Sequence, residues 1–157
     1  MRAQRIYIDT SVIGGCFDAE FAPWSNGLFK DFRLGLYLPV VSLIVETEIR
    51  NAPEAVRERY HELISLGAEI LEPDNSVYAL AAAYEKRGII TAKYRLDGLH
   101  IALATSAEVD LLVSWNFRHI VHYDKIRLFN AVNLQSGYTP LQIFSPREVT
   151  HYGEQGI

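Results

Sequence analysis

The feature that most constrains the fold is an apolar run near the N-terminus that ends abruptly in an acid. Residues 5–13 read Arg-Ile-Tyr-Ile-Asp-Thr-Ser-Val-Ile, so a β-favouring stretch meets Asp9 and then two small hydroxyl residues. A short uninterrupted run of this kind is typical of a strand buried on both faces of a parallel sheet. Open parallel sheets bind their ligands at the carboxyl ends of the strands, so we expect Asp9 at a functional edge. The alternative is that Asp9 simply caps the helix that follows.

Short apolar runs alternate with helical patterns along the rest of the chain. Further strands are predicted at 38–42, 68–71, 110–114 and 141–144, and helices at 11–38 (interrupted after Gly14 and Gly15), 43–50, 53–65, 77–86, 96–107 and 125–133. Strands that alternate with helices predict an α/β fold, in which a parallel sheet is covered by helices on both faces. The 157 residues, 49% of them hydrophobic, suit one domain with a substantial core. We place this domain at residues 1–150 and expect a short flexible tail at 151–157.

The composition excludes several classes of protein. Cys16 is the only cysteine, which excludes an internal disulfide and a multi-cysteine zinc site. No apolar stretch is long enough to span a bilayer, and strand-like sequence begins too early for a signal peptide, so we expect a cytoplasmic protein. Fifteen basic and nineteen acidic residues give a net charge of −4. That charge does not favour a protein that coats nucleic acid non-specifically, although it leaves room for a local basic rim.

Three acidic residues share one feature, because each lies where an apolar element meets a connection. Asp9 ends the first predicted strand, Glu48 lies in the helix after the second, and Asp97 opens the helix before the fourth. The fourth strand then runs into Ser114-Trp115-Asn116. In a parallel sheet these places converge on one carboxyl edge. Clustered carboxylates repel one another unless a cation lies between them, and clusters of oxygen ligands alone suit Mg²⁺ or Mn²⁺.

Glu46 and Glu48 compete for the middle position of this acidic set. Two residues apart on a helix, their side chains point to nearly opposite sides. Glu48 has Ile44 and Val45 one turn before it, so its side of the helix begins apolar and faces inward. Glu46 has Arg50 four residues later, which favours a plain surface ion pair. We therefore favour Glu48 for the site.

The surroundings of Asp97 allow both functional and structural interpretations. Asp97 is either a site residue or the N-cap of its helix. His100 lies one turn further on, where a helix-surface or core role is favoured over a role in the site. The pair His119–His122 lacks a third ligand and is more typical of a surface. Basic residues flank the Asp97 and Asn116 segments, and they form either a phosphate-contacting rim or an ordinary solvated face. These residues are Lys86, Arg87, Lys93, Arg95, Arg118, Lys125 and Arg127.

Four short motifs occur in order along the chain. They are Ile6-Tyr-Ile-Asp-Thr-Ser-Val, Val41-Ser-Leu-Ile-Val-Glu-Thr-Glu-Ile, Asp97-Gly-Leu-His-Ile-Ala-Leu-Ala and Leu112-Val-Ser-Trp-Asn-Phe. Together they resemble the ordered motifs of PIN-domain proteins, and most closely those of the VapC-like toxin ribonucleases of type II toxin–antitoxin systems. Each motif alone is weak, but their order and spacing are specific. The resemblance covers nearly the whole chain, including the closing Gly137-Tyr-Thr-Pro-Leu-Gln-Ile-Phe-Ser-Pro.

The resemblance implies a PIN-like three-layer α/β/α sandwich with a mainly parallel central sheet and a Mg²⁺-dependent site, with Mn²⁺ as a substitute. It implies that Asp9, Glu48 and Asp97 hold the metal and that Asn116 assists catalysis. A family member with a further acid near the Asn116 loop would bind the metal more tightly. The supporting hydroxyls that it implies are those of Thr10, Ser11 and Ser114.

We therefore expect a metal-dependent endoribonuclease that hydrolyses phosphodiester bonds of single-stranded RNA, with Lys93, Arg95 and Arg118 contacting the RNA. The resemblance also implies a toxin neutralised by a small cognate antitoxin, and a homodimer. One alternative is a non-catalytic PIN-fold module that binds RNA or protein. Another is a HAD-like phosphohydrolase with Asp9 as covalent nucleophile. Those phosphatases carry a second aspartate two residues later, where this chain has Ser11.

Overall fold

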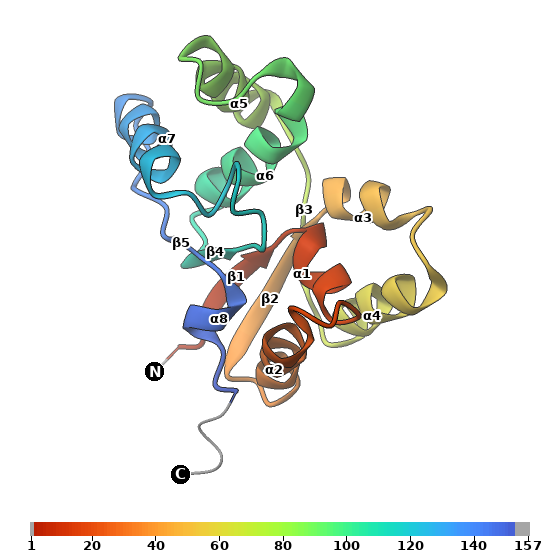
Figure 1. Cartoon of the computed structure of the whole chain (residues 1–157). Coiled ribbons are helices and arrows are strands. Elements are labelled where there is room, and N and C mark those ends of the chain that lie inside the picture. The colour runs from red at the N-terminus through yellow and green to blue at the C-terminus, as the bar shows by residue number, and fades with distance from the viewer. Residues whose placement is uncertain (1, 153–157) are drawn as a thin grey trace.

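The computed structural model describes residues 2–152, which contain a central sheet of five parallel strands (Figure 1). The strands are β1 (Gln4–Ile8), β2 (Tyr37–Ser42), β3 (Glu69–Leu71), β4 (Leu111–Val113) and β5 (Ile143–Phe144). Their order is β3-β2-β1-β4-β5, so β1 lies in the middle, and every neighbouring pair is parallel. The predicted parallel sheet is confirmed.

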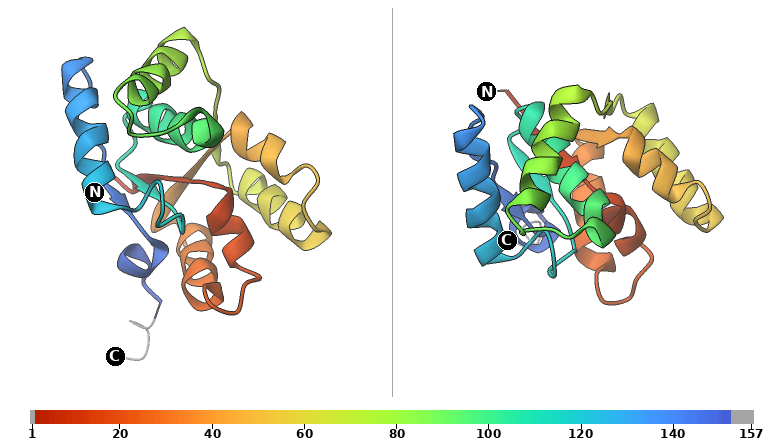
Figure 2. Two further views of the ribbon diagram at one scale, coloured as in Figure 1. Left: turned by 45° about the horizontal axis from the view of Figure 1, so that its top comes forward. Right: turned by 90° about the horizontal axis from the view of Figure 1, so that it is seen from above.

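Helices cover both faces of this sheet. They are α1 (Thr10–Gly15), α2 (Ala22–Arg33), α3 (Leu43–Ile49), α4 (Glu54–Ser65), α5 (Asn75–Lys86), the 3-10 helix η1 (Ala92–Tyr94), α6 (Arg95–Ser106), α7 (Tyr123–Gln135) and α8 (Pro146–Val149). Figures 1 and 2 show α5, α6 and α7 on one side of the strands and α1, α2 and α4 on the other. The expected three-layer α/β/α sandwich is therefore confirmed. No helix in residues 2–152 is long and apolar enough to cross a membrane.

The central strand divides the core into two halves, because successive side chains of a strand point to opposite faces. Ile6 and Ile8 are fully buried against α1, α2, α3 and α4. Tyr7, also fully buried, points the other way and packs with the apolar side chains of α5, α6 and α7. Burial of a large apolar side chain is worth about 1.5–3 kcal/mol, so both faces of β1 contribute to stability. Tyr7 carries a polar hydroxyl into this core, which becomes important at the site.

Local sequence signals explain most of the element boundaries. The predicted interruption after Gly14 and Gly15 is present, since α1 ends at Gly15 and α2 starts at Ala22, with Pro23 in its first turn. Gly67 follows α4 with a φ of +87°, the left-handed conformation that glycine adopts at a helix C′ position. The short helix α8 was not predicted. Its Ser145 and Glu148 form a capping box, which stabilises a single turn after Pro146.

The segment after α8 packs against α2. The carboxylate of Asp31, 2% exposed, accepts hydrogen bonds from the Thr150 hydroxyl at 3.0 Å and the His151 backbone N–H at 2.9 Å. Gly27 lies below Tyr152, and a Cβ atom at Gly27 would come within 2.6 Å of the Tyr152 Cβ. Of the tail predicted at 151–157, residues 153–157 lie outside the described residues.

Candidate active site

Asp9 lies at the carboxyl end of β1 and is 5% exposed. Ile8 pairs in register with Val113, so the residues that follow these two strands, Asp9 and Ser114, are neighbours. Ser114 Oγ donates to Asp9 Oδ2 at 2.7 Å, and Ser11 Oγ donates to Oδ1 at 2.6 Å. The Asp9 side chain makes no capping hydrogen bond to α1, which argues against the simple cap.

The electrostatic state of Asp9 reflects its burial. Burial raises the pKa of its carboxyl group. The charge of His100 and the hydrogen bonds from Ser11 and Ser114 pull the pKa down, whereas the charge of Glu48 raises it further, and the net shift is upward. An ionised Asp9 is therefore held at a cost, which a nearby cation would relieve.

Ser11 and Ser114 also fix the loop after β4. Ser11 Oγ accepts a hydrogen bond from the Trp115 N–H at 2.9 Å, and Ser114 Oγ accepts one from the Asn116 N–H at 2.9 Å. The two hydroxyls thus tie the start of α1, the end of β1 and the Asn116 loop together. Their contacts suit the supporting role expected for them.

Glu48 and Glu46 leave α3 in different directions. Glu48 Oε1 accepts a hydrogen bond from the Thr10 hydroxyl at 2.8 Å, which places Glu48 beside the start of α1. Glu46 and Arg50 instead line a depression together with Tyr60 of α4. After burial, the charge of Glu46 is the second cause that raises the Tyr60 pKa. The structure thus brings Glu48 to the acidic set and places Glu46 against α4.

A buried chain of hydrogen bonds supports Glu48 from below. His100 Nε2 lies 2.8 Å from Glu48 Oε1, and His100 Nδ1 lies 2.6 Å from the Tyr7 hydroxyl. The Tyr7 hydroxyl is in turn 2.8 Å from Ser42 Oγ. Tyr7, Ser42 and His100 are at most 2% exposed. Sequence reasoning did not include Tyr7 or Ser42 and favoured a surface or core role for His100.

The pKa shifts of His100 and Glu48 both favour the charged form of the residue concerned. Burial alone would lower the pKa of His100, but the Glu48 hydrogen bond and the charges of Asp9, Glu48 and Asp97 outweigh burial and raise it. Burial alone would raise the pKa of Glu48, but the hydrogen bond and charge of His100, helped by Thr10, lower it. Both shifts favour a protonated His100 paired with an ionised Glu48.

Asp97 is half-buried in the first turn of α6. The N-cap position of α6 is Tyr94, so the interpretation of Asp97 as that cap is wrong. Burial raises the Asp97 pKa, the charges of His119 and His100 and a hydrogen bond with Asn116 lower it, and the charge of Glu48 raises it, with a net upward shift. These interactions place Asp97 within electrostatic reach of Glu48 and next to the Asn116 loop.

The three basic residues predicted to contact RNA divide into two groups. Arg95 forms a bidentate ion pair with Glu85 of α5, with Nε–Oε2 and Nη2–Oε1 distances of 2.8 and 3.0 Å. Lys93 and Arg118 instead lie against the ring of Tyr94, each with its cationic centre 5.4 Å from the ring centroid. The structure thus brings Lys93 and Arg118 together on the ring of Tyr94 and pairs Arg95 with α5.

The donor chemistry of the acidic set fits a hard cation. Within residues 2–152, no three His, Cys, Asp or Glu side chains lie close enough to hold a metal ion by themselves. Mg²⁺ in proteins is often held by one or two carboxylates, with water and substrate phosphate as its other ligands. Asp9 and Asp97 supply such carboxylates, and both have raised pKa values that a cation would lower. Both hydrogen bonds to Glu48 fall on Oε1, so Oε2 is its oxygen for a further ligand.

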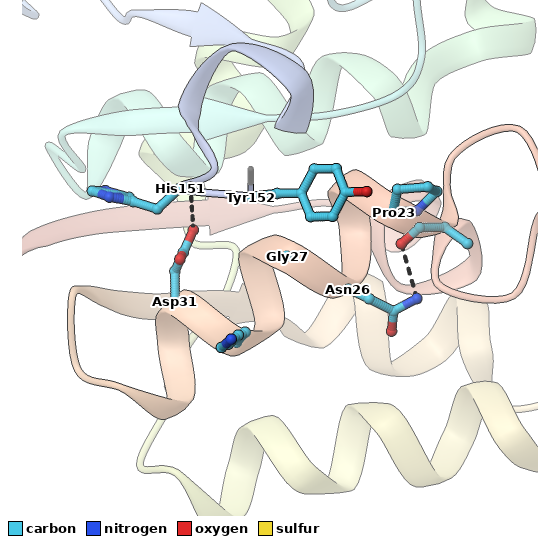
Figure 3. A pocket seen from close by; sticks show the side chains of 8 residues that line it. Pro23, Asn26, Gly27, Asp31, His151 and Tyr152 are labelled. Atoms are coloured by element: carbon cyan, nitrogen blue, oxygen red, sulfur yellow. Dashed lines mark hydrogen bonds between the residues drawn. The ribbon is translucent and has the colours of Figure 1, made fainter. Parts of the chain in front are cut away.

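A separate pocket of about 520 Å³ lies between α2 and the segment after α8 (Figure 3). Its lining includes Asn26, Gly27, Asp31 and Tyr152. None of the acids of the candidate site lines it, and Asp31 is already hydrogen-bonded to the chain. We therefore place the chemistry at the sheet edge rather than here.

Comparisons with known proteins identify the fold. No family model and no curated protein matches the sequence. Among solved structures, that of FitAcB from Neisseria gonorrhoeae matches with a TM-score of 0.59 and 19% identity, over 92% of this chain and 99% of that chain. The structure of VapBC2 from Rickettsia felis, bound to a DNA fragment from their promoter, matches with a TM-score of 0.56 and 13% identity, over 90% of this chain and 98% of that chain. The chain therefore has a PIN-like α/β/α fold that it shares, over nearly its whole length, with chains of FitAcB and VapBC2.

Proposed function

We propose that this protein is a metal-dependent endoribonuclease that hydrolyses RNA phosphodiester bonds and acts as a toxin neutralised by a small antitoxin. One observation carries the proposal: at the carboxyl edge of a PIN-like sheet the charge of Glu48 raises the pKa of both Asp9 and Asp97, and all three acids act on the same buried His100. The structural similarity to FitAcB and VapBC2 supports the proposed role as the toxin of a toxin–antitoxin pair.

In this proposal Asp9, Glu48 and Asp97 hold Mg²⁺, or Mn²⁺ in its place, together with water and the substrate phosphate as its other ligands. When bound, the metal activates water and stabilises the oxygens of an in-line phosphoryl displacement. Ser11 and Ser114 orient the Asp9 carboxylate through their hydrogen bonds. The carboxylate ligands of metals are commonly fixed by such outer hydrogen bonds.

Two further residues orient the remaining acids. His100 fixes Glu48 Oε1 at 2.8 Å, which leaves Oε2 for the metal. Asn116 holds Asp97 through its hydrogen bond. Two residues after Asn116 the chain reaches Arg118, the exposed cation that lies on the Tyr94 ring.

We propose the cytoplasm as the location and a small antitoxin as the partner, with a homodimer as the assembled form. Exposed apolar side chains gather at the C-terminal ends of α2 and α4, which the Arg33–Glu62 ion pair joins at 2.7 Å. Exposed apolar surface of this kind suits a partner protein. The side chains are Leu34, Leu36, Ile64 and Leu66.

The test is cleavage of a mixture of structured and unstructured RNAs by the purified protein with Mg²⁺, with Mn²⁺ or with EDTA, beside the variant Asp9→Asn. We expect the wild type to cleave unpaired RNA only when metal is present and Asp9→Asn to be slower by orders of magnitude. Equal cleavage by the two proteins, or full activity in EDTA, contradicts the proposal.

A second candidate is a non-catalytic module that binds RNA or protein. The contact between His100 and Glu48 favours it, because the chain itself already supplies Glu48 with a hydrogen-bonded partner at 2.8 Å. Binding of RNA or antitoxin without metal binding and without cleavage is the result that selects this candidate. The phosphohydrolase alternative gains no support, since Ser11 stands where its second acid is needed and donates to Asp9.

A further inference from the structure

We propose that Lys93, Tyr94, Phe117 and Arg118 form a subsite for one unpaired nucleotide of the RNA beside the cleavage site. Lys93 and Arg118 bind its phosphate, and Phe117 stacks on its base. The inference rests on the proposed function, because it assigns the subsite to the same substrate.

Two cations share one aromatic ring in this subsite. Lys93 Nζ and Arg118 Cζ each lie 5.4 Å from the centroid of the Tyr94 ring. Neither takes part in any ion pair within residues 2–152, and both side chains are exposed. Two like charges held near one ring repel each other unless an anion joins them. A phosphodiester oxygen is the anion that an RNA strand brings to this position.

The Tyr94 ring has a firm support on its inner side. Its centroid lies 4.0 Å from that of the His119 ring, with the two planes 34° apart. His119 is 8% exposed, and burial followed by the charge of Lys125 lowers its pKa, so the supporting ring is neutral at neutral pH. The Lys125 ammonium lies 3.4 Å from His119 Nδ1. Tyr94 is thus held in place before any ligand arrives, and it keeps the two cations near one another.

The subsite is joined directly to the acidic set. Asn116 hydrogen-bonds to Asp97, and its Oδ1 accepts the His119 N–H at 3.0 Å. Phe117 and Arg118 lie between Asn116 and His119 in the same loop. A phosphate on Lys93 and Arg118 is therefore adjacent to the carboxylates rather than on a remote surface.

Phe117 supplies an exposed aromatic face on this loop. It is 50% exposed, and its ring meets Trp115 edge-on with centroids 6.1 Å apart. Trp115 is itself stacked on Phe21 at 4.2 Å, so Phe117 leans on a packed aromatic base. Proteins bind unpaired bases by stacking them on such rings, and paired bases are not available for it. The ligand is therefore single-stranded.

The phosphate part is tested by fluorescence anisotropy with a labelled oligouridylate in EDTA, so that binding is measured without cleavage. We expect the double variant Lys93→Ala/Arg118→Ala to bind at least roughly tenfold more weakly at low salt. The slope of log K against log salt should become shallower by about 0.7, which is the contribution of the one single-strand phosphate that the two cations bind together. Arg95→Ala removes a neighbouring charge that is paired with Glu85, so it should stay within about twofold of wild type.

The base part is tested with Phe117→Leu in the same assay. We expect binding to weaken by roughly tenfold with an unchanged salt slope, because stacking does not release counterions. Tyr123→Leu is the matched control, since Tyr123 is an exposed aromatic of α7 outside the subsite. Circular dichroism confirms that each variant is folded.

The outcomes separate this inference from the proposed function. If wild type cleaves RNA while the double variant and Phe117→Leu bind as tightly as wild type, the subsite is wrong and the nuclease stands. If wild type binds RNA and the variants lose binding as expected, but no metal supports cleavage, the subsite stands and the nuclease falls. Absence of RNA binding by wild type overturns the subsite.

Discussion

His100 and Glu48 form an ion pair beneath the candidate site, with Nε2 2.8 Å from Oε1 and the histidine side chain buried. The other nitrogen of the same ring meets the hydroxyl of Tyr7 at 2.6 Å, so the ring is fixed at both ends. A ligand carboxylate held by a buried partner keeps its orientation when a cation arrives or leaves. The chain thus supplies its own counter-charge for one of its three clustered acids.

This pair predicts a pH-dependent stability in the metal-free protein. The folded pKa of His100 is raised above its ordinary value of 6.5. The stability that protonated His100 contributes is therefore fully present below about pH 6.5 and is lost as the pH rises through the raised folded pKa. Urea unfolding in EDTA, from mildly acidic to alkaline pH, should show this decline for wild type and a flatter profile for His100→Asn. The same decline in both proteins would show that another group is responsible.

Asp97→Asn should make the metal-free fold more stable and the metal response weaker. The folded pKa of Asp97 is raised, so its ionised form costs stability at neutral pH, and this cost disappears as the pH falls toward its ordinary value of 3.8. Thermal melts at neutral pH in EDTA should thus place the variant above wild type. Saturating Mn²⁺ should stabilise wild type by about 2.7 kcal/mol at about a hundredfold excess over the dissociation constant. The variant should shift much less.

Glu46→Gln is the control for that experiment, because it removes a carboxylate from the same protein outside the acidic set. Its Mn²⁺ shift should equal that of wild type. An equal shift for Asp97→Asn would remove Asp97 from the metal ligands. No shift in any of the three proteins at millimolar Mn²⁺ would favour the non-catalytic module.

Gly14 and Gly15 provide a matched pair for the packing beneath the site. A Cβ at Gly15 would come within 2.6 Å of Ser25 Oγ and 2.7 Å of Trp115 Nε1, two buried atoms that are hydrogen-bonded at 2.8 Å. A Cβ at Gly14 meets nothing within 4 Å. Gly15→Ala should lower the free energy of unfolding by about 1–3 kcal/mol through overpacking. Gly14→Ala should be neutral or stabilising by up to about 1 kcal/mol, since alanine favours helix.

Chemical denaturation, followed by tryptophan fluorescence, measures the free energy of unfolding of both glycine variants. Trp115 is a suitable probe because it is one of the contacted residues. Equal stabilities of the two variants would mean that the chain makes room at Gly15 more easily than its contacts indicate.

The sheet and its acidic edge were predictable because they follow from local patterns. The run that ends at Asp9 has the length and composition of a buried parallel strand, and strand ends converge whatever the details of packing. The choice of Glu48 over Glu46 needed only the direction of side chains on a helix, and the structure brings Glu48 to Thr10. The break between α1 and α2 followed from Gly14 and Gly15.

The support beneath the acids was not predicted, because it depends on contacts between distant segments. Tyr7, Ser42 and His100 come from three elements, and only their packing shows that their polar atoms meet. A signal existed in Tyr7, since a hydroxyl in a strand buried on both faces needs a partner. Likewise, nothing in the sequence separates Arg95, which pairs with Glu85, from Arg118, which lies on Tyr94.

The short helix α8 was missed for a different reason. It has only four residues, which is too short for a hydrophobic period, and its signal is the spacing of Ser145 and Glu148 around Pro146. A capping box can be recognised in a sequence from the spacing of its two residues, without any hydrophobic periodicity.

The central claim, that one set of acids at the sheet edge performs the chemistry, is tested most directly by the RNA cleavage rates of Glu48→Gln and Glu46→Gln in saturating Mn²⁺. The two residues are neighbours on α3 and carry the same charge, but only Glu48 contacts Thr10 and His100. We predict that Glu48→Gln loses cleavage by orders of magnitude while Glu46→Gln keeps most of the wild-type rate. Similar rates for the two variants, or the greater loss in Glu46→Gln, would contradict the account.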